Sequence, residues 1–241
     1  MRTMTLLVLA TSAMAVAGSG VAARAGSSEA PLPPVPPASE FRAQIDNPWF
    51  PLVAGSRYVY VGVKDGAPSR DVVTVSRQVR LIAGVPCAVV LDRLYRRGRL
   101  FERTTDWYSQ DGAGNVWYFG EDTAELDKNG HVTSTEGTWM TGVAGAQPGI
   151  YMPAHPRLGQ SGRQEFYKGH AEDHFSVMAL SGTVAGGPPS VKTILLTEEW
   201  TPLEPGTLDH KMYVRGVGTV FEQTVKGGNE RAELVAVTRS S

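Results

Sequence analysis

The chain has almost no cysteine: Cys87 is the only one in 241 residues. A single thiol excludes an internal disulfide, and its distance from the N-terminus excludes lipid attachment to a cysteine there. Cys87 lies in an apolar run, residues 85–91, where a buried small hydrophobic side chain is expected rather than a nucleophile. The folded domain must therefore be held together by burial alone.

The sequence also lacks the motifs of several common catalytic and nucleotide-binding sites. It contains no P-loop, no glycine-rich dinucleotide-binding turn, no His-Glu-x-x-His and no Cys-x-x-Cys. The nearest approach to a serine nucleophile elbow, GQSG at 159–162, has the wrong spacing. Serine, cysteine and nucleotide-dependent mechanisms therefore have no support, and a binding role is favoured over an enzymatic one.

Neither a large charge excess nor a long hydrophobic run is present. The 24 acidic and 23 basic residues nearly cancel, which argues against nucleic acid or an anionic membrane as the main partner. The longest apolar run, residues 4–16, is too short to anchor the chain across a bilayer, and no second candidate follows it. The sequence therefore predicts no membrane span.

That apolar run belongs to a predicted secretory signal. Arg2 supplies the positive n-region, residues 4–16 the apolar h-region, and Ala23-Arg24-Ala25 the small-x-small pattern that signal peptidase reads. We expect cleavage near Ala25, so that the mature chain begins at Gly26 and is periplasmic or secreted.

The mature chain is predicted to be a tether followed by one all-β domain. Residues 26–44 are rich in proline, serine and alanine and predict a disordered tether, and the domain covers residues 45–241. Short strand-like segments follow one another, joined by turns such as Asn129-Gly130, and no sustained helical period occurs. This pattern predicts a single antiparallel meander that closes into a barrel or half-barrel. The expected strands are 57–63, 71–82, 85–95, 100–108, 116–119, 163–171, 174–183, 191–200, 209–215, 219–226 and 231–238.

One long glycine-rich segment, residues 133–162, interrupts the strand pattern. Loops of this length are usually functional or disordered. Its bulky residues, Trp139, Ile150, Tyr151 and Met152, argue against disorder. We expect the segment to pack across the mouth or wall of the barrel.

Aromatic residues define one candidate ligand site. Trp107 and Trp117 lie on the two strands of one predicted hairpin, where cross-strand aromatic pairs also stabilise a sheet. A barrel interior lined by such side chains could instead hold an apolar ligand. The candidate ligand-binding residues are Trp107, Trp117, Trp139, Tyr151 and Met152.

A candidate metal site is given by His170, Glu172 and His174. Alternate residues of a β-strand share a face, and two imidazoles with one carboxylate are suitable ligands for zinc, iron or copper. Side chains two apart on a strand lie roughly 6–7 Å apart, so a bend at Gly169 or another ligand would be needed. The alternative is that this face is solvated. One divalent transition metal is thus the only cofactor that the sequence suggests.

Acidic residues form a further group: Glu121-Asp122, Glu136, Glu172-Asp173 and Glu198-Glu199. Paired carboxylates can serve as general acid and base or bind calcium. Neighbouring acids on a strand point to opposite faces, however, and no calcium-binding repeat is present. We interpret most of them as solvated hairpin ends or partners of arginines.

Several strings resemble a family of secreted bacterial proteins of uncharacterised function, over nearly the whole mature chain. Glu172 and Asp173 match the strings of this resemblance, whereas the family need not have histidine at positions 170 and 174. It implies, by analogy of fold, a half-barrel carrier of lipids or lipoproteins in the cell envelope. The strings are IDNPWFP at 45–51, DWYSQD at 106–111, GNVWYFGEDT at 114–123, STEGTW at 134–139, PGIYMPA at 148–154, AED at 171–173 and EWTPLEP at 199–205.

Three functions remain open. The favoured one is an extracytoplasmic binding module for an apolar or amphipathic small molecule held under residues 133–162. The alternatives are a metal-dependent enzyme that uses His170, Glu172 and His174, and a structural protein that interacts with an envelope component.

Overall fold

The computed structural model describes residues 30–181 and 194–239. The predicted signal, residues 1–25, and the first part of the predicted tether lie outside the described residues. The only helix in the described part is a 3₁₀ turn, η1, Ala38–Glu40. Nothing in the described ranges forms a helix long and apolar enough to cross a membrane.

The rest of the ordered structure is strands. They are β1 Arg57–Lys64, β2 Ala67–Ile82, β3 Val85–Arg96, β4 Arg99–Gln110, β5 Val116–Leu126, β6 Val132–Ser134, β7 Trp139–Met140, β8 Gln147–Met152, β9 Ser161–Arg163, β10 Glu165–Phe166, β11 His174–Ala179, β12 Ile194–Trp200, β13 Leu208–Val214, β14 Gly218–Lys226 and β15 Arg231–Thr238.

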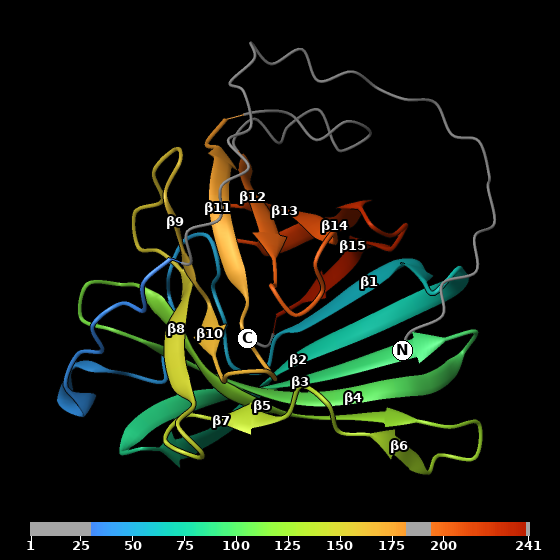
Figure 1. Cartoon of the computed structure of the whole chain (residues 1–241), viewed down its shortest axis with the longest axis horizontal. Coiled ribbons are helices and arrows are strands. Elements are labelled where there is room, and N and C mark those ends of the chain that lie inside the picture. The colour runs from blue at the N-terminus through green and yellow to red at the C-terminus, as the bar shows by residue number, and fades with distance from the viewer. Residues whose placement is uncertain (1–29, 182–193, 240–241) are drawn as a thin grey trace.

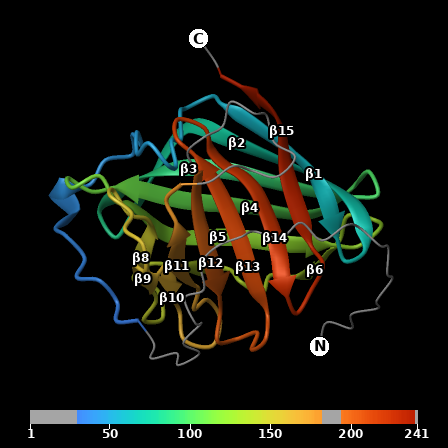
Figure 2. The ribbon, with the colours of Figure 1, turned by 90° about the horizontal axis from the view of Figure 1, so that it is seen from above.

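All of these strands belong to one antiparallel sheet that nearly closes into a barrel. Thirteen follow one path, β10-β8-β5-β4-β3-β2-β1-β15-β14-β13-β12-β11-β9, and the short β6 and β7 pair with β5. Figure 1 shows the long strands β1–β5 on one side and β11–β15 curling over them. From above, β12–β15 lie in front of β3–β5 and cross them steeply (Figure 2). The predicted all-β antiparallel meander is confirmed.

The near-closure of the barrel depends on one short stretch, residues 161–166. Its first part, β9, pairs with β11, with Arg163 opposite His174. Its second part, β10, pairs with β8, with Glu165 opposite Pro148. A single stretch of chain therefore contacts both ends of the meander. Of the two positions predicted for residues 133–162, the mouth and the wall, the structure has the wall: the segment supplies most of β6, all of β7 and β8, and the start of β9.

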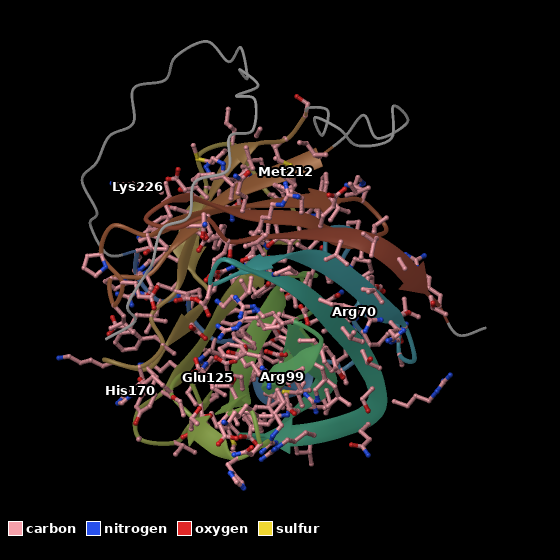
Figure 3. All side chains as sticks on the ribbon, turned by 90° about the vertical axis from the view of Figure 1, so that its right-hand side faces the viewer. Arg70, Arg99, Glu125, His170, Met212 and Lys226 are labelled. Carbon is pink, nitrogen blue, oxygen red and sulfur yellow. The ribbon has the colours of Figure 1, made fainter. Side chains whose placement is uncertain are left out.

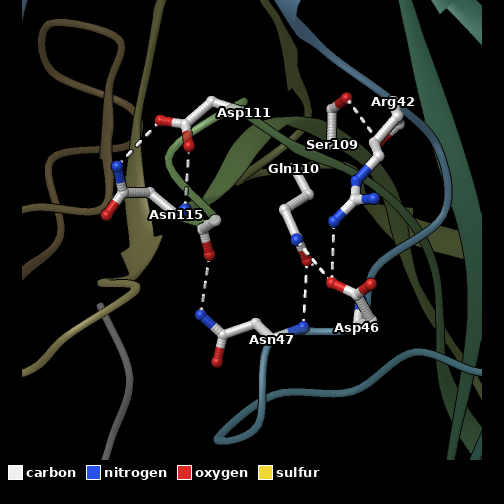
Figure 4. Close-up of polar contacts among 8 residues, drawn as sticks. Arg42, Asp46, Asn47, Ser109, Gln110, Asp111 and Asn115 are labelled. Carbon is white, nitrogen blue, oxygen red and sulfur yellow. Dashed lines mark hydrogen bonds and ion pairs between the residues drawn. The ribbon is translucent and has the colours of Figure 1, made fainter.

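The segment before the first strand is tied to one end of the sheet. Asn47, which is 2% exposed, donates through its side chain to the carbonyls of Gly114 (2.9 Å) and Pro153 (3.2 Å). Gln110 Oε1 accepts from the backbone N–H of Asn47, and Gln110 donates to Asp46 (Figure 4). The packed chain also includes residues predicted as tether, because Phe41 is buried and Arg42 pairs with Gln110.

Two apolar clusters lie on opposite faces of β3–β5. The strand alternation puts Tyr108 and Tyr118 into the larger cluster, which faces the inside of the barrel. Trp107 and Trp117 point the other way, into a smaller cluster with Cys87. Phe41 covers that outer cluster, with its ring edge-on to Trp117 at 5.8 Å.

Candidate functional site

The five predicted ligand-binding residues do not form one site. Trp107 and Trp117 are 2% exposed and belong to the outer cluster, where the Trp117 indole donates to Asp111 at 2.8 Å. Trp139, Tyr151 and Met152 are in or against the inner cluster. Of the five, Tyr151 alone lines a cavity described below.

The first cavity lies inside the barrel and measures about 170 Å³. The side chains of Phe50, Tyr108 and Tyr151 form one wall, with ring centroids 4.7–5.4 Å apart. Val73 and Val90 extend the apolar lining. A wall of aromatic rings and valines is suited to an apolar group, which agrees with the chemistry predicted for the interior.

Carboxyl groups cross the same interior as a diagonal stripe. Asp71, Asp92 and Asp106 line the first cavity from the neighbouring strands β2, β3 and β4. Glu121 on β5 is directly opposite Asp106 and continues the stripe into a second cavity. Each of the three aspartates is in phase with inward apolar residues of its own strand, such as Val90 two positions before Asp92. The interior is therefore apolar and acidic together.

Burial perturbs the acids of this stripe. Removal from water raises the pKa of Asp106 to about 7, although a 2.6 Å hydrogen bond donated by Tyr118 lowers it in part. Burial, and next the nearby Asp71, raise the pKa of Asp92 well above its ordinary value. Burial and then Asp106 do the same to Glu121. Burial in the fold thus favours the protonated form of each of these three groups.

The second cavity is larger, about 590 Å³, and is bordered by β5, β10, β12, β13 and β14 and by turns between strands. It shares Glu222 with the first cavity. Its lining carboxyls are Glu121, Glu136, Glu165, Asp173, Glu199, Glu204, Asp209 and Glu222.

Lys211 is the one lysine in the lining, which has no arginine. Its Nζ lies 2.9 Å from Glu199 and 3.8 Å from Glu222. Burial lowers the pKa of Lys211, but Glu199 and Glu222 together outweigh that effect and raise it well above its ordinary value. Glu199 is further fixed by hydrogen bonds from Thr197 (2.8 Å) and Tyr213 (3.1 Å). Lys211 thus forms ion pairs with two of the eight carboxyls, and its charge also lowers in part the pKa of Asp173 and of Glu165.

The three predicted metal ligands do not share a strand face, because the predicted strand 163–171 is broken. His170 lies in an exposed turn, stacked on Tyr167, at the edge of the molecule in Figure 3. Glu172 instead accepts a 2.7 Å hydrogen bond from the backbone of Gly169. His174 is buried at the start of β11 and stacks on Trp200. Within residues 30–181 and 194–239, no three His, Cys, Asp or Glu side chains converge as a metal would require.

Sequence reasoning missed the inward acids because it treated acidic residues mainly as hairpin ends. A signal was present: Asp71 is in phase with Val73 and Val75, and Asp106 with Tyr108. A carboxyl at an inward position of an alternating strand indicates a polar interior, because burying it in an apolar interior costs free energy. Glu121 is also brought into line by a register shift beside Trp107 and Tyr108, which alternation alone does not reveal.

Two solved structures resemble this fold at low sequence identity. One is a protein described as exported, with a YmcC-like fold, from Bacteroides fragilis: 15% identical over 79% of this chain and 99% of that one, with a TM-score of 0.43. The other is a protein described as a lipoprotein from Parabacteroides distasonis: 10% identical over 80% and 100%, with a TM-score of 0.40. No model of a known protein family matches the sequence, and no curated protein matches it either.

Proposed function

We propose that this protein binds an amphipathic small molecule inside its barrel, outside the cytoplasm. The observation that carries the proposal is the pair of cavities that both border Glu222, one with a wall of aromatic rings beside four carboxyls and the other lined mainly by polar groups with eight carboxyls. An aromatic wall beside many carboxyls suits a ligand that has both an apolar and a polar part. The predicted signal, residues 1–25, supports the compartment.

The volumes are in keeping with a small molecule. The larger cavity, about 590 Å³, is within the range of roughly 300–1,000 Å³ typical of ligand pockets. The smaller cavity, about 170 Å³, has room for a short alkyl or aromatic group beside Tyr151. Strands of the barrel wall line most of the first cavity, whereas strands and the turns between them line the second.

The test begins with protein purified from its own cells. Native mass spectrometry and solvent extraction are expected to reveal a bound molecule, or the protein should take up an added amphiphile. The substitution Val73→Phe would fill part of the first cavity and is expected to reduce uptake. Val79→Phe, at a position 58% exposed on the same strand, is the matched control. An empty protein that ignores fatty acids, phospholipids, alkyl alcohols and alkylamines would refute the proposal.

A further inference from the structure

The distribution of charge around the two cavities is strongly one-sided. Four carboxyls line the first and eight the second, with Glu222 common to both, so eleven acids stand against Lys211 alone among lysines and arginines. The whole chain has nearly equal numbers of acidic and basic residues, 24 and 23. In the part of the chain that the structure describes, the arginines and the other lysines lie outside this lining, so acidic groups greatly outnumber basic ones around the two cavities.

Several of these acids lack a compensating cation. Glu165 is 5% exposed and lines the second cavity; its Oε2 accepts no hydrogen bond of ordinary geometry, although the nearby Trp139 side chain lowers the pKa of Glu165 in part. Within the described ranges, neither Glu165 nor Glu121 forms an ion pair, and Lys211 is held by Glu199 and Glu222. Buried carboxyls that face one another without a cation must hold protons or accept a positive group from outside.

We propose that the polar end of the ligand is a protonated amine that binds among Glu121, Glu165 and Asp173. This inference rests on the proposed binding function and names the chemical class of its ligand. An ammonium group is a compact cation with three hydrogen-bond donors, so it can satisfy Oε2 of Glu165 and reach a second carboxyl at once. The neighbouring aromatic cavity then accommodates its apolar part.

A bound metal ion fits the site less well than an organic cation. A metal needs three or more ligands that converge on one point, and no such group exists in the described residues. The carboxyls are instead spread along β5, β10 and the turn before β11, around a cavity of about 590 Å³. A fatty acid or another anion is disfavoured, since it would place one more negative charge among acids that already repel each other.

The decisive comparison uses probes that share one alkyl chain. Decylamine, decanol and decanoate are titrated into the full mature chain by calorimetry, each below the concentration at which it forms micelles. Decylamine should have the highest affinity and should bind about 10- to 100-fold more tightly than decanol, because a hydrogen bond to a charged group contributes about 1.5–3 kcal/mol. Decanoate should bind most weakly.

The outcomes separate the two proposals. If all three probes bind equally, the binding function stands and the amine inference is overturned. If none binds, both proposals are overturned for this class of amphiphile. Spermidine distinguishes two sources of the amine. If spermidine binds tightly, amino groups alone suffice, as in a polyamine. If decylamine binds tightly and spermidine does not bind, the ligand is an amphiphile.

Variants locate the amine within the cavity. Glu165→Gln and Glu121→Gln should each weaken decylamine binding about 10-fold and leave decanol unchanged, because they remove a charge and keep the shape. Glu233→Gln, an exposed position on β15, is the matched control. Equal effects of Glu165→Gln and Glu233→Gln on decylamine would show adsorption to a negative surface and overturn the site. The decanol affinity reports whether each variant is folded.

Discussion

Replacing Asp106 by asparagine should make the protein more stable at neutral and alkaline pH. Asp106 is 9% exposed and accepts a hydrogen bond from Tyr118 at 2.6 Å. Burial raises the pKa of its carboxyl from 3.8 to about 7. Asparagine keeps an oxygen that can accept from Tyr118 but carries no charge, so it removes the cost of burying a carboxylate.

The size of the effect follows from the two pKa values. A group whose pKa is raised by folding favours the folded state below its unfolded value, and that contribution is lost as the pH rises through about 7. Relative to full protonation, the Asp106 carboxyl costs about 1.7 kcal/mol at about pH 5 and about 4 kcal/mol at about pH 8. Wild type should therefore lose about 2.5 kcal/mol between these two pH values because of this one group.

Urea unfolding at the two pH values, followed by tryptophan fluorescence, measures the difference. Asp106→Asn should lose about 2.5 kcal/mol less than wild type on going from about pH 5 to about pH 8. Asp122→Asn, at an exposed position of β5, is the control and should follow wild type. If Asp106→Asn shows the same pH dependence as wild type, folding does not raise the pKa of Asp106 as the reasoning requires.

Three further predictions concern the packing around the barrel. Asn47→Ala should destabilise the protein by about 2–3 kcal/mol in urea unfolding, because it leaves the Gly114 and Pro153 carbonyls without their donor; a loss below about 0.5 kcal/mol would contradict this. In Gly120→Ala, where φ is +135°, the new Cβ would lie 2.4 Å from the Trp139 carbonyl oxygen. We expect a loss of about 3 kcal/mol in the free energy of unfolding, which lowers Tm by roughly 6–12 °C. The control Gly98→Ala, with no atom within 4 Å of its Cβ, should lower Tm much less. Cys87 is completely buried, and burial raises the pKa of its thiol to about 12. An aromatic disulfide reagent should therefore label Cys87 only when urea unfolds the protein. If the native protein were labelled as fast as the unfolded protein, the packing of the outer cluster would be contradicted.

Local pattern was sufficient for most of the strands. Alternation and turn residues predict strands at 57–63, 85–95 and 231–238, and the structure has them at Arg57–Lys64, Val85–Arg96 and Arg231–Thr238. The pattern failed around His170, where the chain makes a turn and so never presents the predicted His-Glu-His face. The short pairings of β9 and β10 depend on two distant partners, β11 and β8, and a local pattern carries no information on either.

The sequence by itself determined which residues alternate and therefore which share a face, but not which face is the inside. Trp107 and Tyr108 are neighbours on β4, and each face of that strand is aromatic. A distant segment determines which face points inward. Phe41, far earlier in the chain, covers the tryptophan side, so that Tyr108 and Asp106 face the cavity. Because burial depends on what packs against a face, and not on the face alone, only the tertiary structure could assign the interior and its acids.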